Sequence, residues 1–238
     1  MSIQGGTSAK LETLKPVGRA DTLAQQVKTQ LKEAVMAGRF TPGEKLTIRS
    51  VASALDVSLT PAREALYNLA SEGVLEMRAN GSVYIPELTV ERIVELTKIR
   101  IALESLAARE ALARISDREI ARIAKLNEEI VDRDERRAYS DLINLNWQFH
   151  FGLYSVSGMD QLVRMIESCW LMMGSYLNLI YPQFGEVNEG IANHKQIVRA
   201  LERRDPDRLA HSIITDINLA TDALIGASEH RNQTNGAN

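Results

Sequence analysis

Residues 58–73 read SLTPAREALYNLASEG, and this stretch decides the fold of the N-terminal part of the chain. Thr60 supplies a capping hydroxyl, and Pro61 has the fixed backbone dihedral that suits the first position of a helix. The apolar side chains that follow share one helical face: Ala65, Leu66 and Leu69. Gly73 is a typical residue for ending a helix. The stretch therefore predicts a short helix that begins at Thr60 and Pro61.

Two more helices are predicted upstream. Apolar residues recur at three- and four-residue steps before Gly38, which indicates one buried helical face: Leu23, Val27, Leu31, Ala34 and Val35. Thr47 can cap a second, shorter helix. Asp56 follows it, where a left-handed residue often makes the turn between two helices.

A β-hairpin is predicted directly after the third helix. The runs 74–77 and 82–85 flank Asn80-Gly81, a strong hairpin signal, and Pro86 closes the second run. Helix, helix, turn, helix and hairpin in this order form a winged helix-turn-helix, whose third helix enters the DNA major groove.

The rest of the chain predicts only helices, at 90–114, 117–134, 137–156, 159–181, 186–203 and 207–227. Their apolar stripes are typical of an antiparallel all-helical bundle, so the fold class is mainly α. The expected domains are a flexible arm (1–18), a DNA-binding domain (19–86), a helical domain for effector binding and dimerisation (87–228) and a disordered tail (229–238).

Composition sets limits on the class of protein. The net charge is -3, yet residues 1–86 carry ten Lys and Arg against eight Asp and Glu, so the excess of acid lies in the second part. The single cysteine, Cys169, excludes an internal disulfide. No secretory signal or long apolar run is visible, and we expect a cytoplasmic protein without a membrane partner.

Several segments resemble a known family. The segments LKEAVMAGRFTPGEKL (31–46) and VSLTPAREAL (57–66), followed by Leu69 and Glu72-Gly73, resemble the GntR family of transcription regulators. Further on, RIALESLAA (100–108), NWQFH (146–150) and Asn193-His194 resemble the FCD ligand-binding domain of the FadR-type branch. The resemblance implies a homodimer that binds a pseudo-palindromic operator, since two-fold protein symmetry is mirrored in the DNA.

Candidate DNA contacts lie mainly on the third predicted helix. Arg63 is one turn into that helix and off its apolar face, so it is the best candidate for a base or phosphate contact; the alternative is a solvated surface arginine. Arg49 and Thr60 match family positions that touch DNA, although Thr60 can also act only as a cap. Ser58 can donate to a phosphate, and the wing tip at Asn80 and Gly81 is the remaining candidate.

The sequence departs from the family where positive charge is usual. Leu59 replaces an arginine before Thr-Pro, Tyr67 and Asn68 take positions that are commonly basic, and the wing tip lacks an additional arginine. Fewer cationic contacts release fewer counterions, so we expect weaker operator binding and a shallower salt dependence. Leu59 has a second possible role, contact with a thymine methyl group.

Candidate metal ligands occur in two pairs. Asn146 and His150 are four residues apart and share a helical face. His194 and Asp216 lie twelve residues before and ten after Pro206, which at about 1.5 Å per residue puts both at one level of two antiparallel helices.

The family pattern has Asp in place of Asn146 and His in place of Asp216. The resemblance implies a divalent metal (Zn, Ni or Mn) at this site. The alternative for each histidine is an ordinary hydrogen bond in the bundle. His211 is a second candidate ligand, because it is one and a half turns from Asp216.

An open metal site would accept a small organic acid as effector. By family position Arg100 is the candidate clamp for its carboxylate, and the alternative is an ion pair with Glu104 one turn later. Tyr176 and Asn178 are candidates to line the same cavity, unless they are simply part of the core.

The sequence thus favours a metabolite-controlled transcription regulator, expected to be a repressor. Two alternatives differ in kind: a metal-dependent enzyme built on the bundle with an appended DNA-binding domain, and an architectural DNA-binding protein whose bundle only dimerises. For the enzyme, no general base or water position can be identified.

Overall fold

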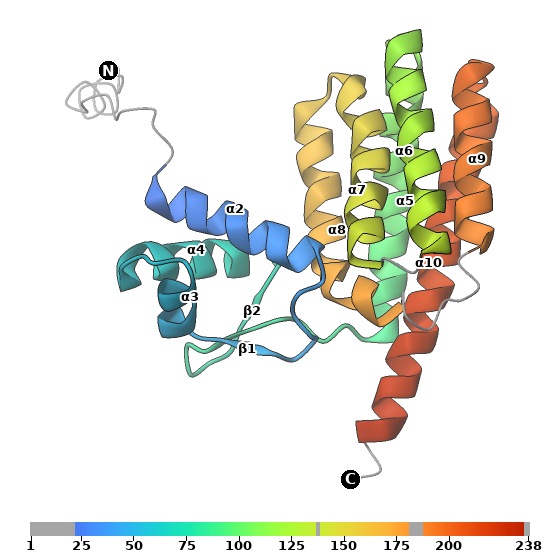
Figure 1. The fold of residues 1–238 in the computed structure, drawn as a ribbon. Coiled ribbons are helices and arrows are strands. Elements are labelled where there is room, and N and C mark those ends of the chain that lie inside the picture. The colour runs from blue at the N-terminus through green and yellow to red at the C-terminus, as the bar shows by residue number, and fades with distance from the viewer. Residues whose placement is uncertain (1–21, 137–138, 181–187, 236–238) are drawn as a thin grey trace, which may run out of the picture.

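The computed structural model describes residues 22–136, 139–180 and 188–235. Figure 1 shows a small N-terminal domain of helices and short strands beside a larger domain of long helices. The arm expected over 1–18 lies outside the described residues.

The first two helices of the N-terminal domain form as predicted. Helix α2 (Leu23–Met36) buries one apolar face, and α3 (Ile48–Ala54) begins at Thr47. The Thr47 side chain accepts from the Ser50 backbone N–H at 3.0 Å, while the Ser50 side chain accepts from the Thr47 N–H, which completes a capping box. Asp56 has a φ of 51°, in the left-handed region expected for this turn.

The start of α4 (Leu59–Ser71) differs from the prediction. Ser58, not Thr60, is the N-cap residue, so Thr60 is already helical and Pro61 is the third helical residue instead of the first. All N–H groups of the first helical turn lack intrahelical partners, so proline is tolerated throughout it and does not mark the first position alone. The predicted apolar face is buried: Ala65, Leu66 and Leu69.

The wing contains one strand more than predicted. Strands β2 (Glu76–Met77) and β3 (Val83–Tyr84) form the expected antiparallel hairpin. Strand β1 (Lys45–Leu46) pairs with the other side of β3, which gives the order β1-β3-β2. A strand of two residues is too short for an alternating sequence pattern to reveal it.

The hairpin loop has three residues and keeps Asn80 at its tip. The Gly81 N–H donates to the Arg78 carbonyl at 2.8 Å, and Gly81 is left-handed with φ at 75°. This is the geometry of a type I turn followed by a glycine bulge. The Asn80 side chain accepts from the Ser82 N–H at 3.0 Å, which braces the tip.

The C-terminal domain consists of the predicted helices, with shifts of one or two residues at their ends except at the end of the last helix. They are α5 (Val90–Leu112), α6 (Asp117–Glu135), α7 (Tyr139–Tyr154) with the short 3-10 turn η1 (Ser155–Ser157), α8 (Asp160–Ile180), α9 (Asn188–Glu202) and α10 (Pro206–Asn235). In the described part of the chain, no helix has both the length and the apolar character required to cross a membrane.

The end of α10 corrects the expected tail. The helix was expected to stop at 227 and to be followed by a disordered tail at 229–238, but it continues to Asn235. The Ser228 hydroxyl donates to the Leu88 carbonyl at 3.3 Å, which ties this part of the helix to the segment between the two domains. Residues 236–238 lie outside the described part.

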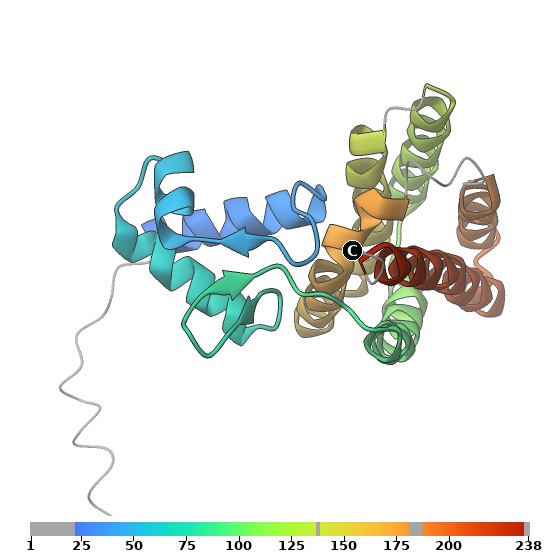
Figure 2. The same ribbon diagram turned by 90° about the horizontal axis from the view of Figure 1, so that it is seen from below.

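The long helices pack around one large apolar core, with a smaller apolar cluster around Leu88 and Tyr176. Helix α5 packs against α8 and α10, while α6 packs against α7 and α9. In Figure 2 the bundle is seen from below, and α5 lies along one of its edges with α8 on one side and α10 on the other.

Helix α8 also joins the two domains. Leu171 is buried in the core of the N-terminal domain, and Lys32 of α2 pairs with Glu167 at 3.5 Å. At Gly174 a Cβ atom would lie 2.9 Å from the Val35 carbonyl oxygen, so α2 and α8 approach closely only because this residue has no side chain. The Leu88 N–H donates to the Tyr176 hydroxyl at 2.7 Å, which anchors the interdomain segment to the same helix.

Candidate functional site

The residues predicted to contact DNA all lie on the surface of the N-terminal domain. They are Arg49, Ser58, Thr60, Arg63, Asn80 and Gly81. Among the described residues Arg63 has no ion-pair partner, so its guanidinium is available to an external anion. Arg49 is exposed on α3, two residues before Val51, which with Ala52 is buried where this helix packs against α4.

The exposed face of α4 also carries apolar and aromatic side chains. Leu59 is 46% exposed and Tyr67 is 40% exposed, and both share the face of Arg63 because the three are four residues apart. Large apolar groups at the surface of a small domain suggest a contact surface. We identify Tyr67 as a further candidate DNA contact; the sequence indicated it only as a loss of positive charge.

The wing holds a basic residue that the sequence analysis did not single out. Arg78 is half exposed, stands over the Tyr84 ring at 3.8 Å and pairs with Glu76 at 3.3 Å. It lies two residues before Asn80, so a cation is present near the wing tip even though the tip itself carries none.

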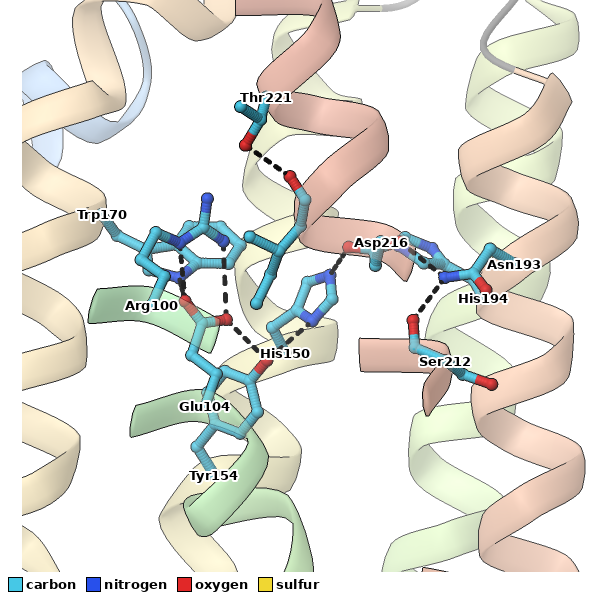
Figure 3. Close-up of polar contacts among 11 residues, drawn as sticks. Arg100, Glu104, His150, Tyr154, Trp170, Asn193, His194, Ser212, Asp216 and Thr221 are labelled. Atoms are coloured by element: carbon cyan, nitrogen blue, oxygen red, sulfur yellow. Dashed lines mark hydrogen bonds and ion pairs between the residues drawn. The ribbon is translucent and has the colours of Figure 1, made fainter. Parts of the chain in front are cut away.

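Three ligand-type side chains meet inside the helical bundle. His150 from α7, His194 from α9 and Asp216 from α10 bring their ligand atoms within 4.8 Å of one another (Figure 3). The His150 Nε2 atom is 3.2 Å from Asp216 Oδ2, and the His194 Nε2 atom is 3.3 Å from Asp216 Oδ1. Both histidines are buried, and the Phe149 ring stacks on that of His194 at 4.4 Å.

The hydrogen bonds around Tyr154 indicate which nitrogen of His150 carries the proton. The Tyr154 hydroxyl donates its single hydrogen to Glu104 Oε2 at 2.7 Å, and it also lies 3.3 Å from His150 Nδ1. Burial and the Glu104 charge raise the pKa of Tyr154 well above its ordinary value, so the phenol keeps this hydrogen. His150 Nδ1 must then be the donor to the Tyr154 oxygen.

When His150 is in its neutral form, this tautomer leaves a lone pair on Nε2. Nε2 is buried and makes no hydrogen bond, although it lies 3.2 Å from Asp216 Oδ2. Nδ1 of His194 is also buried without a hydrogen-bond partner. A lone pair of His150 Nε2 that faces a carboxylate in a buried site would be stabilised by a cation between them, so the donor set fits a divalent metal.

The charge of Asp216 is strongly favoured. Burial alone would raise the pKa of its carboxyl, but the neighbouring His194 and His150, in their protonated forms, lower it well below its ordinary value. Asp216 is therefore an anion in the folded protein, as a metal ligand has to be.

A second polar cluster borders these three residues. The Glu104 carboxylate is fully buried and accepts from Arg100 Nε at 2.6 Å, from Trp170 Nε1 at 3.0 Å and from Tyr154. The Arg100 guanidinium lies 4.7 Å from the centre of the Trp170 ring. Burial would lower the pKa of Arg100, but Glu104 outweighs it and the pKa is raised, so the pair is charged.

The ion pair that was the alternative role for Arg100 is therefore present. Glu104 engages Nε and, at 3.5 Å, Nη2 of the guanidinium. Because Glu104 occupies the Nε edge of the guanidinium, an effector carboxylate could not bind that edge with both oxygens. It would bind Nη1 instead.

The other candidates divide between the site and its surroundings. Asn146 is half-buried on α7 and makes no hydrogen bond among the described residues; Asn193 instead donates to Asp216 Oδ1 at 3.2 Å and to the Ser212 carbonyl at 2.8 Å. His211 is exposed and lies outside the group of three, which corrects its assignment as a second ligand.

Of the two residues expected to line the cavity, one has another contact. Tyr176 is buried in a separate apolar cluster with Leu88, and its hydroxyl is engaged by the Leu88 backbone. It therefore braces the segment between the domains. The side chain of Asn178 lies outside the described residues.

Sequence reasoning missed the residues that hold His150. Tyr154 continues the four-residue spacing of Asn146 and His150 on α7, and this repeat was the available signal. Trp170 offered none, because an aromatic residue in an apolar helical stretch is ordinarily read as core.

Comparisons with known proteins agree with this arrangement of domains. A family model described as "Bacterial regulatory proteins, gntR family" matches residues 23–85, and one described as "FCD domain" matches residues 95–218.

The proteins that are similar to this chain over most of their length are transcription regulators. The "HTH-type transcriptional regulator McbR" of Escherichia coli (strain K12) is 30% identical over 194 residues, which are 81% of this chain and 88% of the relative. A "Probable D-xylose utilization operon transcriptional repressor" of Paenarthrobacter nicotinovorans is 26% identical over 216 residues, 89% of this chain and 91% of the relative. The solved structure "E. coli McbR/YncC" has a TM-score of 0.81 at 28% identity and covers 86% of this chain and 98% of its own.

Proposed function

Because the chain belongs to the GntR family of bacterial regulatory proteins and carries an FCD domain, we propose that it is a repressor controlled by a small carboxylate-bearing metabolite. That the protein is a DNA-binding transcription regulator, and not an enzyme, follows from the family. The observation that carries the rest is the group of His150, His194 and Asp216, in which one ring nitrogen of each histidine is buried without a hydrogen-bond partner.

The N-terminal domain, 19–86, is the proposed DNA-reading unit. Arg63 and Arg49 supply exposed cations, Thr60 and Ser58 supply hydroxyls at the start of α4, and the wing adds Asn80. Phosphate contacts set the position of a protein on the duplex and base-edge contacts set the sequence it prefers, so we assign Arg63 to the groove. As a homodimer the protein would bind a pseudo-palindromic operator.

The helical domain, 87–228, is the proposed sensor. His150, His194 and Asp216 would hold a divalent metal, with Asn146 as a further oxygen donor. Two imidazoles and one carboxylate suit Zn, Ni or Mn. When bound, the metal supplies a Lewis-acid centre with positions open to an effector carboxylate.

The chain's own residues would orient that effector. Arg100 is held by Glu104 and Trp170 so that Nη1 remains for an effector oxygen, and its charge is fixed by the buried carboxylate beside it. A ligand that favours one arrangement of the bundle would shift the balance between states with high and low DNA affinity.

The DNA-reading assignment is tested with a duplex selected for binding from a random library. Arg63→Ala should lower affinity for this duplex by about tenfold or more, which is the usual effect of losing one arginine contact to DNA. Arg118→Ala, an exposed arginine of the helical domain, is the matched control. Equal affinities of the two variants would remove Arg63 from the reading helix.

The sensor assignment is tested on the same protein–DNA complex. A panel of small organic acids is added after treatment with chelator, and again with Zn²⁺, Ni²⁺ or Mn²⁺ restored. Release of DNA by an acid only when metal is present supports the proposal. Release that does not depend on metal would place the effector elsewhere, and no release by any acid would favour an architectural role.

A further inference from the structure

Helix α5 carries an apolar stripe on its solvent side. Ile99 is 38% exposed and Leu106 is 42% exposed, and the exposed Ala102 lies between them. Steps of three and four residues place all three on one face of the helix. Apolar residues with this spacing are typical of a helix that packs against another helix.

The same face ends in opposite charges. Glu95 lies one turn before Ile99 and Arg109 lies three residues after Leu106, and both side chains are more than half exposed. Ala102 is seven residues from each of them, so it is the midpoint of the stripe formed by Glu95, Ile99, Ala102, Leu106 and Arg109.

Helix α8 extends the apolar surface beside this stripe. The Arg92 side chain at the start of α5 reaches the Met172 sulfur at 3.9 Å, so Met172 is on the side of α8 that borders α5. Met165 is two turns before Met172 and shares that side, and it is 48% exposed. The patch is thus broader than one helix.

We propose that this face binds a second copy of the chain, with the two α5 helices antiparallel and Ala102 at the two-fold axis. In this arrangement Glu95 stands opposite the partner's Arg109, and Arg109 stands opposite the partner's Glu95. Parallel packing would instead oppose like charges at both ends of the stripe. The small side chain of Ala102 allows close approach of the helices at the axis, and a two-fold contact uses one patch on both copies.

The charges set the register more than the affinity. Each already has a partner in its own chain, Arg92 for Glu95 and Asp207 at 3.4 Å for Arg109, so the contact would create mixed clusters at the rim. Rim charges mainly steer association and exclude wrong alignments, while the central apolar residues supply most of the binding energy.

This inference rests on the homodimer in the proposed function and names its surface. Ile99 and Arg100 are neighbours in sequence, so one helix faces the partner on one side and the effector site on the other. A change at Arg100 would therefore act on the contact that spaces the two DNA-binding domains.

A disulfide across the axis is the first test. Ala102→Cys is made with Cys169→Ser, which removes the only native thiol, and the full-length protein is oxidised mildly. Two cysteines can bridge only when their Cα atoms are within about 7 Å, so residue 102 should form a covalent dimer while Lys125→Cys on exposed α6 should not.

Charge reversal is the second test. Glu95→Arg and Arg109→Glu should each raise the dimer dissociation constant about tenfold or more, and the double variant should recover most of the loss. Recovery can come only from pairs between chains, since positions 95 and 109 are fourteen residues apart on one helix, about 21 Å, and do not meet within a chain. The measurement is sedimentation equilibrium, with circular dichroism as the check on folding.

The outcomes separate the surface from the proposed function. If the native chain is dimeric but residue 102 gives no disulfide and the double variant shows no recovery, the α5 surface is wrong and the homodimer stands. A native chain that is monomeric both free and on DNA overturns the surface and the homodimer together.

Discussion

The proton on His150 is set by residues that would not touch a metal. The Tyr154 hydroxyl donates a hydrogen bond to Glu104 and accepts one from His150 Nδ1, which leaves Nε2 as the ligand atom. Partners of this kind fix the ring orientation and the tautomer of metal-binding histidines in many proteins.

Removing the Tyr154 hydroxyl should therefore weaken metal binding without removing a ligand. Tyr154→Phe is expected to lower Zn²⁺ affinity by about 10- to 100-fold, the usual effect of losing such a partner. Isothermal titration with competing chelator measures it. Tyr176→Phe is the matched control, because it removes a buried tyrosine hydroxyl that binds the Leu88 backbone instead; an equal loss in both variants would refute the role of Tyr154.

The lowered pKa of Asp216 predicts how stability depends on pH in metal-free protein. An aspartate with a lowered folded-state pKa stabilises the fold fully above its ordinary pKa of about 3.9, and this stabilisation is lost as pH falls below that value. Asp216→Asn should thus be less stable than the native chain at pH 5, with the gap closing toward pH 2. Urea unfolding in chelator at several pH values measures the gap, and a gap that is constant with pH would contradict the assignment.

At this scale the sequence predicted ligand types better than their surroundings. Spacing placed Asn146 and His150 on one helical face and set His194 and Asp216 at one level, and the structure brings His150, His194 and Asp216 together. The sequence did not reveal that the Asn193 amide lies beside Asp216. Asn193 and His194 are consecutive on one helix, and helical periodicity does not show which of two adjacent residues contacts a given partner. Glu104 was recognised only as a partner of Arg100, since contacts with Tyr154 and Trp170 depend on how separate helices pack.

Among the elements, α8 has a role in both domains. It contributes Trp170 to the polar cluster and Leu171 to the core of the DNA-binding domain. Its close approach to α2 depends on Gly174, where an added Cβ would meet the Val35 backbone oxygen at 2.9 Å.

Gly174→Ala is therefore expected to separate α2 from α8 in spite of alanine's higher helix propensity. The variant should have a lower melting temperature and an altered affinity for DNA. Gly226→Ala is the control, because a Cβ there meets no atom within 4 Å and the change should stabilise α10 by about 0.5–1 kcal/mol. Thermal unfolding of both variants decides the matter, and stabilisation by both would show that the approach at Gly174 is not tight.

The elements themselves were largely predictable, and the exceptions have physical causes. Long helices were found to within a few residues because periodicity accumulates over many turns. The start of α4 was misplaced since Pro61 fits several positions in a first turn, and β1 was missed because two residues carry no period. The continuation of α10 depends on contacts such as that of Ser228 with Leu88, which are absent from local sequence.

For the whole molecule, the proposed metal links three helices that are far apart in the sequence. A ligand that binds only the folded state stabilises it by an amount that grows with its concentration, about 2.7 kcal/mol at a hundred times the dissociation constant. Zn²⁺ or Ni²⁺ should consequently raise the melting temperature by several degrees. His150→Ala with His194→Ala should abolish the rise, whereas His211→Ala, which changes an exposed histidine, should retain it; a rise that survives the double change would disprove the site.

Leu171 and Trp170 are consecutive residues, yet one belongs to the DNA-binding core and the other to the cluster that holds Arg100. Helix α8 lies after the domain boundary near residue 87 in the sequence, yet it contributes to both domains. A hybrid regulator can be made by joining the DNA-binding domain of one relative to the sensor domain of another. It would also need the residues of α8 that pack against that DNA-binding domain. A junction placed only in the connecting segment would yield two folded halves that no longer communicate.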